Sequence, residues 1–240
     1  MCIPASFIIT RQRTLWLVNS DSHEDIIDFY SLKEGDFVRI EISPPNMDYT
    51  FPIDQWVYKT DQDILPEWHN DKWAEEMCRL ELPKWYKAHV ITSGKHKLSG
   101  KISKIILGGM VEVTGQTGGD CRFVDNSQGK VTGQIGGNCR FYDNSQGKVT
   151  GQIGGNCRFV GNSQGKVTGQ TGGYCWFVGN SQGKVTGQTG GNCRFVDNSQ
   201  GKVTGQIGGN CRFYDNSQGK VTGQTGGNCW FYGNSKKMEL

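Results

Sequence analysis

The chain has 240 residues, of which 35 are Gly, 9 are Cys and 6 are Pro, and its formal charge is +3. This length suits one or two domains with a hydrophobic core, but the glycine content, about twice the usual share, argues against an ordinary globular enzyme. Glycine does not recur at every third residue, which excludes collagen, and no apolar run approaches the roughly 18 residues of a membrane span. The N-terminus has no basic region before its short apolar stretch. We therefore predict a soluble, cytoplasmic protein that does not associate with a membrane.

Residues 1–94 predict a small α+β head domain. Helix and strand patterns place strands at Ser6–Thr10, Thr14–Val18, Phe37–Ile42 and Gln55–Lys59, a helix at Ser22–Tyr30, and one or two helices in Pro66–His89 with an interruption at Pro83. The first helix has a well-marked start, because Asp21 or Ser22 can cap it and the acids that follow suit its positive end.

Two polar clusters in the head are candidate functional groups. One lies at the start of the first helix and the other follows the last strand; their members are His23, Glu24 and Asp25, and Asp61, Asp63, Glu67 and His69. The two clusters could converge on a metal or form an acid–base pair, and His23, Glu24, Asp63 and His69 are the catalytic candidates. The alternative is ordinary solvated surface. Arg11 and Arg13 predict a solvated turn, with anion binding as the second interpretation.

An 18-residue repeat begins at Val113 and decides the architecture of the rest of the chain. A typical unit, Val131–Lys148, reads VTGQIGGNCRFYDNSQGK, and seven copies run to Ser235 before a charged tail at 236–240. Fixed-period repeats indicate stacked units that cannot bury their apolar faces alone. Residues 95–112 predict an irregular first coil, with Ile105, Leu107 and Val111 facing inward.

Alternate residues of the repeat form one small or apolar set and one polar set. This is the period-2 pattern of a strand with one buried face, and because 18 is even, the pattern continues through every copy. The unit also divides into CRFYDN, SQGKVT and GQIGGN. These three six-residue sides resemble the hexapeptide left-handed parallel β-helix. We therefore predict a mainly β protein, with a parallel β-solenoid of about seven coils capped by the α+β head.

Stacked coils would align identical residues into ladders. One position of the repeat holds only Asp or Gly, which tolerate left-handed backbone, so we place it at an exposed corner; its members are Asp125, Asp143, Gly161, Gly179, Asp197, Asp215 and Gly233. Seven cysteines form another ladder. No CxxC spacing supports a zinc site, so we expect buried thiols with a packing role, and we assign no metal and no cofactor. Cys2 could be an N-terminal nucleophile, but a structural role is favoured.

A column of lysines runs along one outer face of the predicted solenoid without an acidic counterpart. Its members are Lys130, Lys148, Lys166, Lys184, Lys202 and Lys220. Basic columns interleaved with aromatic residues can bind nucleic acid or another polyanion. A solvated face that keeps the protein soluble is the competing interpretation.

The segments MCIPASF, SDSHEDII, VRIEISPP and DQDILPEW of the head resemble an uncharacterised domain of bacterial and phage proteins. The resemblance implies a setting, the host cytoplasm if the chain is phage-encoded, and no chemistry. We predict a non-enzymatic binding or scaffold protein, in which the solenoid presents or oligomerises the head, as a dimer or trimer, to a protein or small-molecule partner. A host-interaction or counter-defence role fits this setting. A nucleotide-handling enzyme in the head and polyanion binding along the lysine column are the alternatives.

Overall fold

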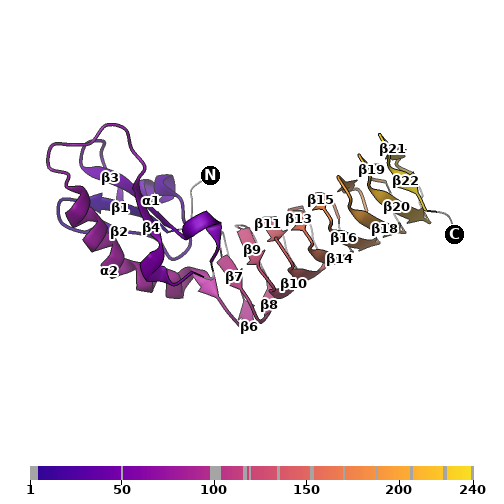
Figure 1. Cartoon of the computed structure of the whole chain (residues 1–240), viewed down its shortest axis with the longest axis horizontal. Coiled ribbons are helices and arrows are strands. Elements are labelled where there is room, and N and C mark those ends of the chain that lie inside the picture. The colour runs from indigo at the N-terminus through magenta and orange to yellow at the C-terminus, as the bar shows by residue number, and fades with distance from the viewer. Residues whose placement is uncertain are drawn as a thin grey trace. The chain divides into compact units, whose positions relative to one another are not determined.

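The computed structural model describes residues 5–49, 51–97, 104–115, 118, 120–133, 136–151, 154–169, 171–187, 189–205, 208–223 and 226–238. Its contacts divide the chain into two compact units, Met1–Val90 and Ile91–Leu240 (Figure 1). Within the described ranges, no helix is both long enough and apolar enough to cross a membrane.

The first unit is an antiparallel four-stranded sheet with two helices, which confirms the predicted α+β head. The strand order is β2-β1-β3-β4. The elements are β1 (Ser6–Thr10), β2 (Thr14–Leu15), α1 (His23–Tyr30), β3 (Phe37–Ser43), the short 3-10 helices η1 (Pro45–Met47) and η2 (Ile53–Gln55), β4 (Val57–Thr60) and α2 (Asp71–His89). Helix α1 begins as predicted, since the Ser22 hydroxyl accepts a hydrogen bond from the Asp25 amide.

Helix α2 runs through Pro83, so the predicted interruption there is wrong. Leu82 and Trp85, which lie close to this proline in the sequence, are 2% and 0% exposed. Burying a large apolar side chain contributes about 1.5–3 kcal/mol, and two of them offset the roughly 3 kcal/mol that an interior proline costs a helix. Packing therefore decides the helix length against local propensity.

The second unit is a parallel β-solenoid, as the repeat predicts (Figure 1). One nine-stranded sheet contains β5 (Val90–Ile91), β7 (Lys104–Leu107), β9 (Asp120–Val124), β11 (Asn138–Phe141), β13 (Asn156–Gly161), β15 (Tyr174–Gly179), β17 (Asn192–Phe195), β19 (Cys211–Phe213) and β21 (Cys229–Phe231). The other contains β6 (Gly94–Lys97), β8 (Met110–Thr114), β10 (Gln128–Thr132), β12 (Gln146–Thr150), β14 (Gln164–Thr168), β16 (Gln182–Thr186), β18 (Gln200–Thr204), β20 (Gln218–Thr222) and β22 (Lys236–Lys237).

Two of the three predicted sides of each coil form these continuous sheets. On the third side the described residues lie mainly in bends, and Thr171 and Thr189 form an isolated parallel bridge. The sequence of this side, GQIGGN, is rich in glycine, which disfavours regular strand structure. The left-handed coiling of the chain that the hexapeptide resemblance implies stays a prediction.

The core of the solenoid consists of ladders of identical side chains. Successive Phe rings are stacked with centroids 4.4–4.8 Å apart, and Val and Cys ladders lie in the same core cluster. A Cβ atom on Gly147 would overlap the ring of Phe141, so glycine is required there. The ladder cysteines are thiols and not disulfides, and all but Cys229 are buried, as predicted. Burial raises the pKa of Cys121 to about 12. Cys2 lies outside the described residues.

The first coil differs from the prediction in its register. Lys104 pairs with Cys121 and Ile105 pairs with Arg122, an offset of 17 residues in place of 18. A shift of one residue exchanges the two faces of a strand, so Ile105 and Leu107 pair with the outward positions Arg122 and Val124, and their predicted place in the inward ladders is wrong. Ile105 is nevertheless buried, at 4% exposed. Val111 pairs with Gly129 and is fully buried, as predicted.

The C-terminal tail also differs from the prediction at its start. Lys236 and Lys237 form β22 and pair with Gln218 and Gly219 of the preceding coil. The charged end of the chain therefore contributes the last strand of its sheet.

The Asp/Gly corner has the predicted left-handed backbone in every coil. The φ angle is 57° at Asp143, 63° at Asp197 and 76° at Gly161. At two corners the aspartate carboxylate also accepts a backbone amide from the coil before it, as Asp197 does from Gly179 at 3.2 Å. The corner thus needs a residue that adopts positive φ without strain.

We expect Asp143→Gly to leave the stability of the solenoid nearly unchanged and Asp143→Val to lower it by about 1–2 kcal/mol, the cost of left-handed backbone for an ordinary residue. Chemical denaturation followed by far-UV circular dichroism measures both. Equal effects of the two substitutions would show that backbone strain does not govern this corner.

Candidate functional site

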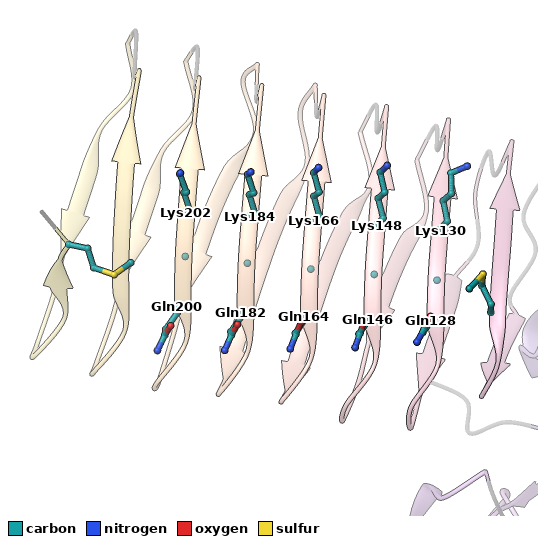
Figure 2. Close-up of a pocket in the computed structure, with 17 residues that line it drawn as sticks. Gln128, Lys130, Gln146, Lys148, Gln164, Lys166, Gln182, Lys184, Gln200 and Lys202 are labelled. Carbon is teal, nitrogen blue, oxygen red and sulfur yellow. The ribbon is translucent and has the colours of Figure 1, made fainter. Parts of the chain in front are cut away.

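The strand sequence QGKVT builds a groove on the outer face of the solenoid. Gln and Lys point outward, whereas Gly and Val point inward, because successive side chains of a strand alternate between faces. The inward glycine packs against a Phe ring of the core. Main chain therefore forms the floor between a row of Gln side chains and a row of Lys side chains, which Figure 2 shows along five coils.

The groove has a volume of about 620 Å³ and is built by repetition. Its two walls are Gln128, Gln146, Gln164, Gln182 and Gln200 on one side and Lys130, Lys148, Lys166, Lys184 and Lys202 on the other, over a floor of Gly129, Gly147, Gly165, Gly183 and Gly201. Met110, which pairs with Gln128 from the preceding coil, and Met238 also line the groove. Lys220 of the predicted column does not line the groove. The lysine wall was predicted from the repeat, whereas the glutamine wall was not, although Gln belongs to the same outward set.

The lysines of the groove differ in whether a nearby carboxylate neutralises their charge. The Lys130 ammonium donates to the Glu112 carboxylate at 2.7 Å, and Lys95 lies 3.6 Å from the same carboxylate. Glu112 occupies the lysine position of the preceding coil, so the prediction that the column has no acidic counterpart is wrong for Lys130. Among the described residues, the other four lysines of the wall form no ion pair.

The repeat holds the positive charges of this row close together, so they repel one another. In-register parallel strands lie about 4.8 Å apart, and two unit charges at that separation repel by about 1 kcal/mol in water, less at physiological salt. Neighbouring exposed lysines, such as Lys148 and Lys166, are held in this register. A bound row of anions would relieve the repulsion along the whole wall.

The outer face of the other sheet uses its cations differently. Arg158 lies over the ring of Trp176, Arg194 over Tyr214 and Arg212 over Trp230, each arginine packing on an aromatic ring of the following coil. These contacts engage the guanidinium groups within the protein. The aromatic residues Trp176, Tyr214 and Trp230 therefore lie on the arginine face and do not line the lysine groove.

The candidate residues of the head do not converge on one catalytic centre. His23 is buried and its Nδ1 lies 3.6 Å from the carboxylate of Asp61, so the two predicted clusters meet at this pair. Glu24 instead accepts a hydrogen bond from the Ser22 hydroxyl at the start of α1, and its pKa is lowered by hydrogen bonds at the helix end. Asp63 lies exposed in a bend.

The remaining head candidates have local partners. His69 contacts the Asp71 carboxylate at 2.9 Å, and the Thr60 hydroxyl donates to the same carboxylate at 2.8 Å. Hydrogen bonds to these groups lower the pKa of Asp71. Arg11 and Arg13 lie over the rings of Trp68 and Tyr30. The two arginines thus pack on aromatic rings of the head.

Comparisons with known proteins add no family to this description. No family model matches the chain, and no curated protein or solved structure shows significant similarity to it.

Proposed function

We propose that this protein is a non-enzymatic binding protein whose solenoid groove holds a linear phosphate polymer, such as single-stranded nucleic acid. The observation that carries the proposal is the in-register row of exposed lysines, Lys148 to Lys202, that lines a groove without carboxylate partners in the described structure. The Gln wall opposite offers amide donors and acceptors to neutral polar groups of the same polymer.

The composition of the groove favours recognition of a polymer by its charged backbone. Proteins that bind single strands through their bases usually stack them on aromatic side chains. The groove is lined by Gln, Gly, Lys and two Met residues, with no aromatic residue among them. Binding would accordingly depend little on base sequence and strongly on salt.

Binding is tested with fluorescently labelled single-stranded DNA, inorganic polyphosphate as competitor, and a peptide nucleic acid of the same base sequence as an uncharged control. We expect the DNA to bind at low salt, polyphosphate to displace it, and the uncharged analogue not to bind. Equal binding of DNA and the uncharged analogue would refute backbone recognition. Displacement by polyphosphate distinguishes phosphate recognition from base recognition.

In this proposal the solenoid also presents the head domain, which contacts a protein or small-molecule partner. Support comes from the resemblance of the head segments to a phage-type domain, which favours a host-interaction or counter-defence role in the host cytoplasm, with the chain acting as a dimer or trimer. The separation of His23 from Asp63 and His69 into different local contacts gives the enzyme alternative little support.

A further inference from the structure

Three potential metal ligands from separate elements meet in the head domain. His23 is the first residue of α1, Glu41 lies in β3, and Asp61 follows β4 directly. One ligand atom from each lies within 4.8 Å of the others. His23 is 1% exposed and Glu41 is 5% exposed, whereas the Asp61 side chain is 41% exposed. Two of the three residues are therefore buried, and the cluster is accessible to solvent beside Asp61.

Sheet pairing explains why the two carboxylates lie together. Glu41 pairs with Lys59 of β4, and the Asp61 amide continues this pairing by donating to the Arg39 carbonyl at 2.9 Å. Alternate residues of a strand share a face, so Glu41 and Asp61 lie on the same side of the sheet, where the start of α1 supplies His23. His23 and Asp61 belong to the two polar clusters predicted from the sequence, whereas Glu41 was not among the predicted residues.

The hydrogen bond of His23 fixes which ring nitrogen can bind a cation. Its Nε2 lies 3.0 Å from the Ile40 carbonyl oxygen. A carbonyl only accepts hydrogen bonds, so Nε2 carries a proton, and in the neutral ring Nδ1 presents its lone pair toward the carboxylates. Metal-binding histidines commonly donate their second ring N–H to a backbone carbonyl in this way.

The distance between His23 and Asp61 also fits a bridging cation. Nδ1 and the Asp61 oxygen are 3.6 Å apart, which is too long for a hydrogen bond. A tetrahedral Zn²⁺ with bonds of about 2.0–2.2 Å holds its ligand atoms about 3.3–3.6 Å apart. The separation thus matches two ligands of one ion.

We propose that His23, Glu41 and Asp61 bind one first-row divalent transition-metal ion, with Zn²⁺ as the reference ion. One imidazole nitrogen with two carboxylates is a set that Zn²⁺ accepts, whereas Mg²⁺ and Ca²⁺ prefer oxygen ligands alone. Three protein ligands leave a coordination position beside the exposed Asp61 for water or another small ligand. This site is independent of the lysine groove and revises the expectation from the sequence that the chain binds no metal.

Isothermal titration of the full-length, chelator-treated protein with ZnCl₂ and with MgCl₂ tests the site. We expect one Zn²⁺ per chain and much weaker Mg²⁺ binding. Asp61→Asn and Glu41→Gln should each weaken Zn²⁺ binding more than about tenfold, since even outer partners of a metal site matter by about 10–100-fold. Asp63→Asn, which removes a carboxylate two residues away, is the matched control and should bind as the wild type does.

Two results would overturn the proposal: a wild-type protein that binds no Zn²⁺ with unit stoichiometry, or an equal loss in Asp61→Asn and Asp63→Asn. The second interpretation of the geometry is a protonated His23 paired with Asp61. In that case Asp61→Asn would destabilise the metal-free protein while Zn²⁺ would leave the wild-type Tm unchanged. Asp61 is partly exposed, so its variant keeps the test valid even if Glu41→Gln does not fold.

Discussion

Replacing Phe177 with alanine is expected to lower the free energy of unfolding of the solenoid by about 3–5 kcal/mol, the usual cost of a phenylalanine-to-alanine change in a core. The Phe177 ring is fully buried and stacks on Phe159 and Phe195 at 4.8 Å on both sides. The hydrogen-bonded coils cannot approach each other more closely to fill the cavity. We therefore expect a loss of unfolding free energy near the upper end of this range.

Chemical denaturation followed by circular dichroism measures this effect, with Trp176→Ala as the control. Trp176 is the neighbouring residue, but it is 37% exposed on the outer face, so its removal should cost much less. A similar loss in both variants would contradict a core built on the Phe ladder.

The contact between Gly183 and the Phe177 ring provides a second test of the same core. A Cβ there would overlap the Phe177 ring, so Gly183→Ala should be damaging in the wild type and well tolerated beside Phe177→Ala.

Neutralising the groove should strongly weaken polymer binding and at the same time stabilise the free protein. The variant carries Lys148→Gln, Lys166→Gln, Lys184→Gln and Lys202→Gln. It removes the three repulsions among these four lysines and those with their neighbours Lys130 and Lys220, each about 1 kcal/mol or less. A chain of this size gains about 2–4 °C in Tm per kcal/mol. We expect a Tm that is a few degrees higher at low salt, with the difference shrinking as salt is added.

A charge-matched variant on the other sheet distinguishes the effect of losing the groove lysines from the effect of lowering the net charge of the protein. Arg122→Gln, Arg158→Gln, Arg194→Gln and Arg212→Gln also remove four positive charges, but from the face where arginines pack on aromatic rings. This variant should retain most of the DNA binding and should not gain stability. A lysine variant that is less stable than the wild type would contradict the account of a row of uncompensated charges.

The solenoid was predictable from the sequence because its period repeats one local pattern many times. The 18-residue repeat fixes the register of the ladders, and the Asp/Gly alternation at Asp143 and Gly161 marks the left-handed corner. The first coil was not predictable, because one missing residue between Lys104 and Cys121 reverses the faces without changing the composition. The lack of a continuous sheet on the glycine-rich third side was also not predictable, since its residues alternate in the same way as those of the two sheets.

The candidate functional residues were predictable only in part. The lysine wall follows directly from the repeat, whereas the groove depends on glycine leaving main chain as its floor. In the head, His23 and Asp61 lie 38 positions apart in sequence, and only the pairing of β3 with β4 adds Glu41. A glutamate in the apolar strand VRIEI was a signal that could have been used, because buried carboxylates need a partner.

The salt dependence of single-stranded DNA binding tests the central claim most directly. For a single strand, the plot of log K against log salt has a slope of about −0.7 for each phosphate contact. Loss of the four lysines from Lys148 to Lys202 should therefore reduce the magnitude of the slope by about 3, while the four-arginine variant should keep the wild-type slope. Equal slopes for the wild type and the lysine variant would show that the groove does not hold the polymer.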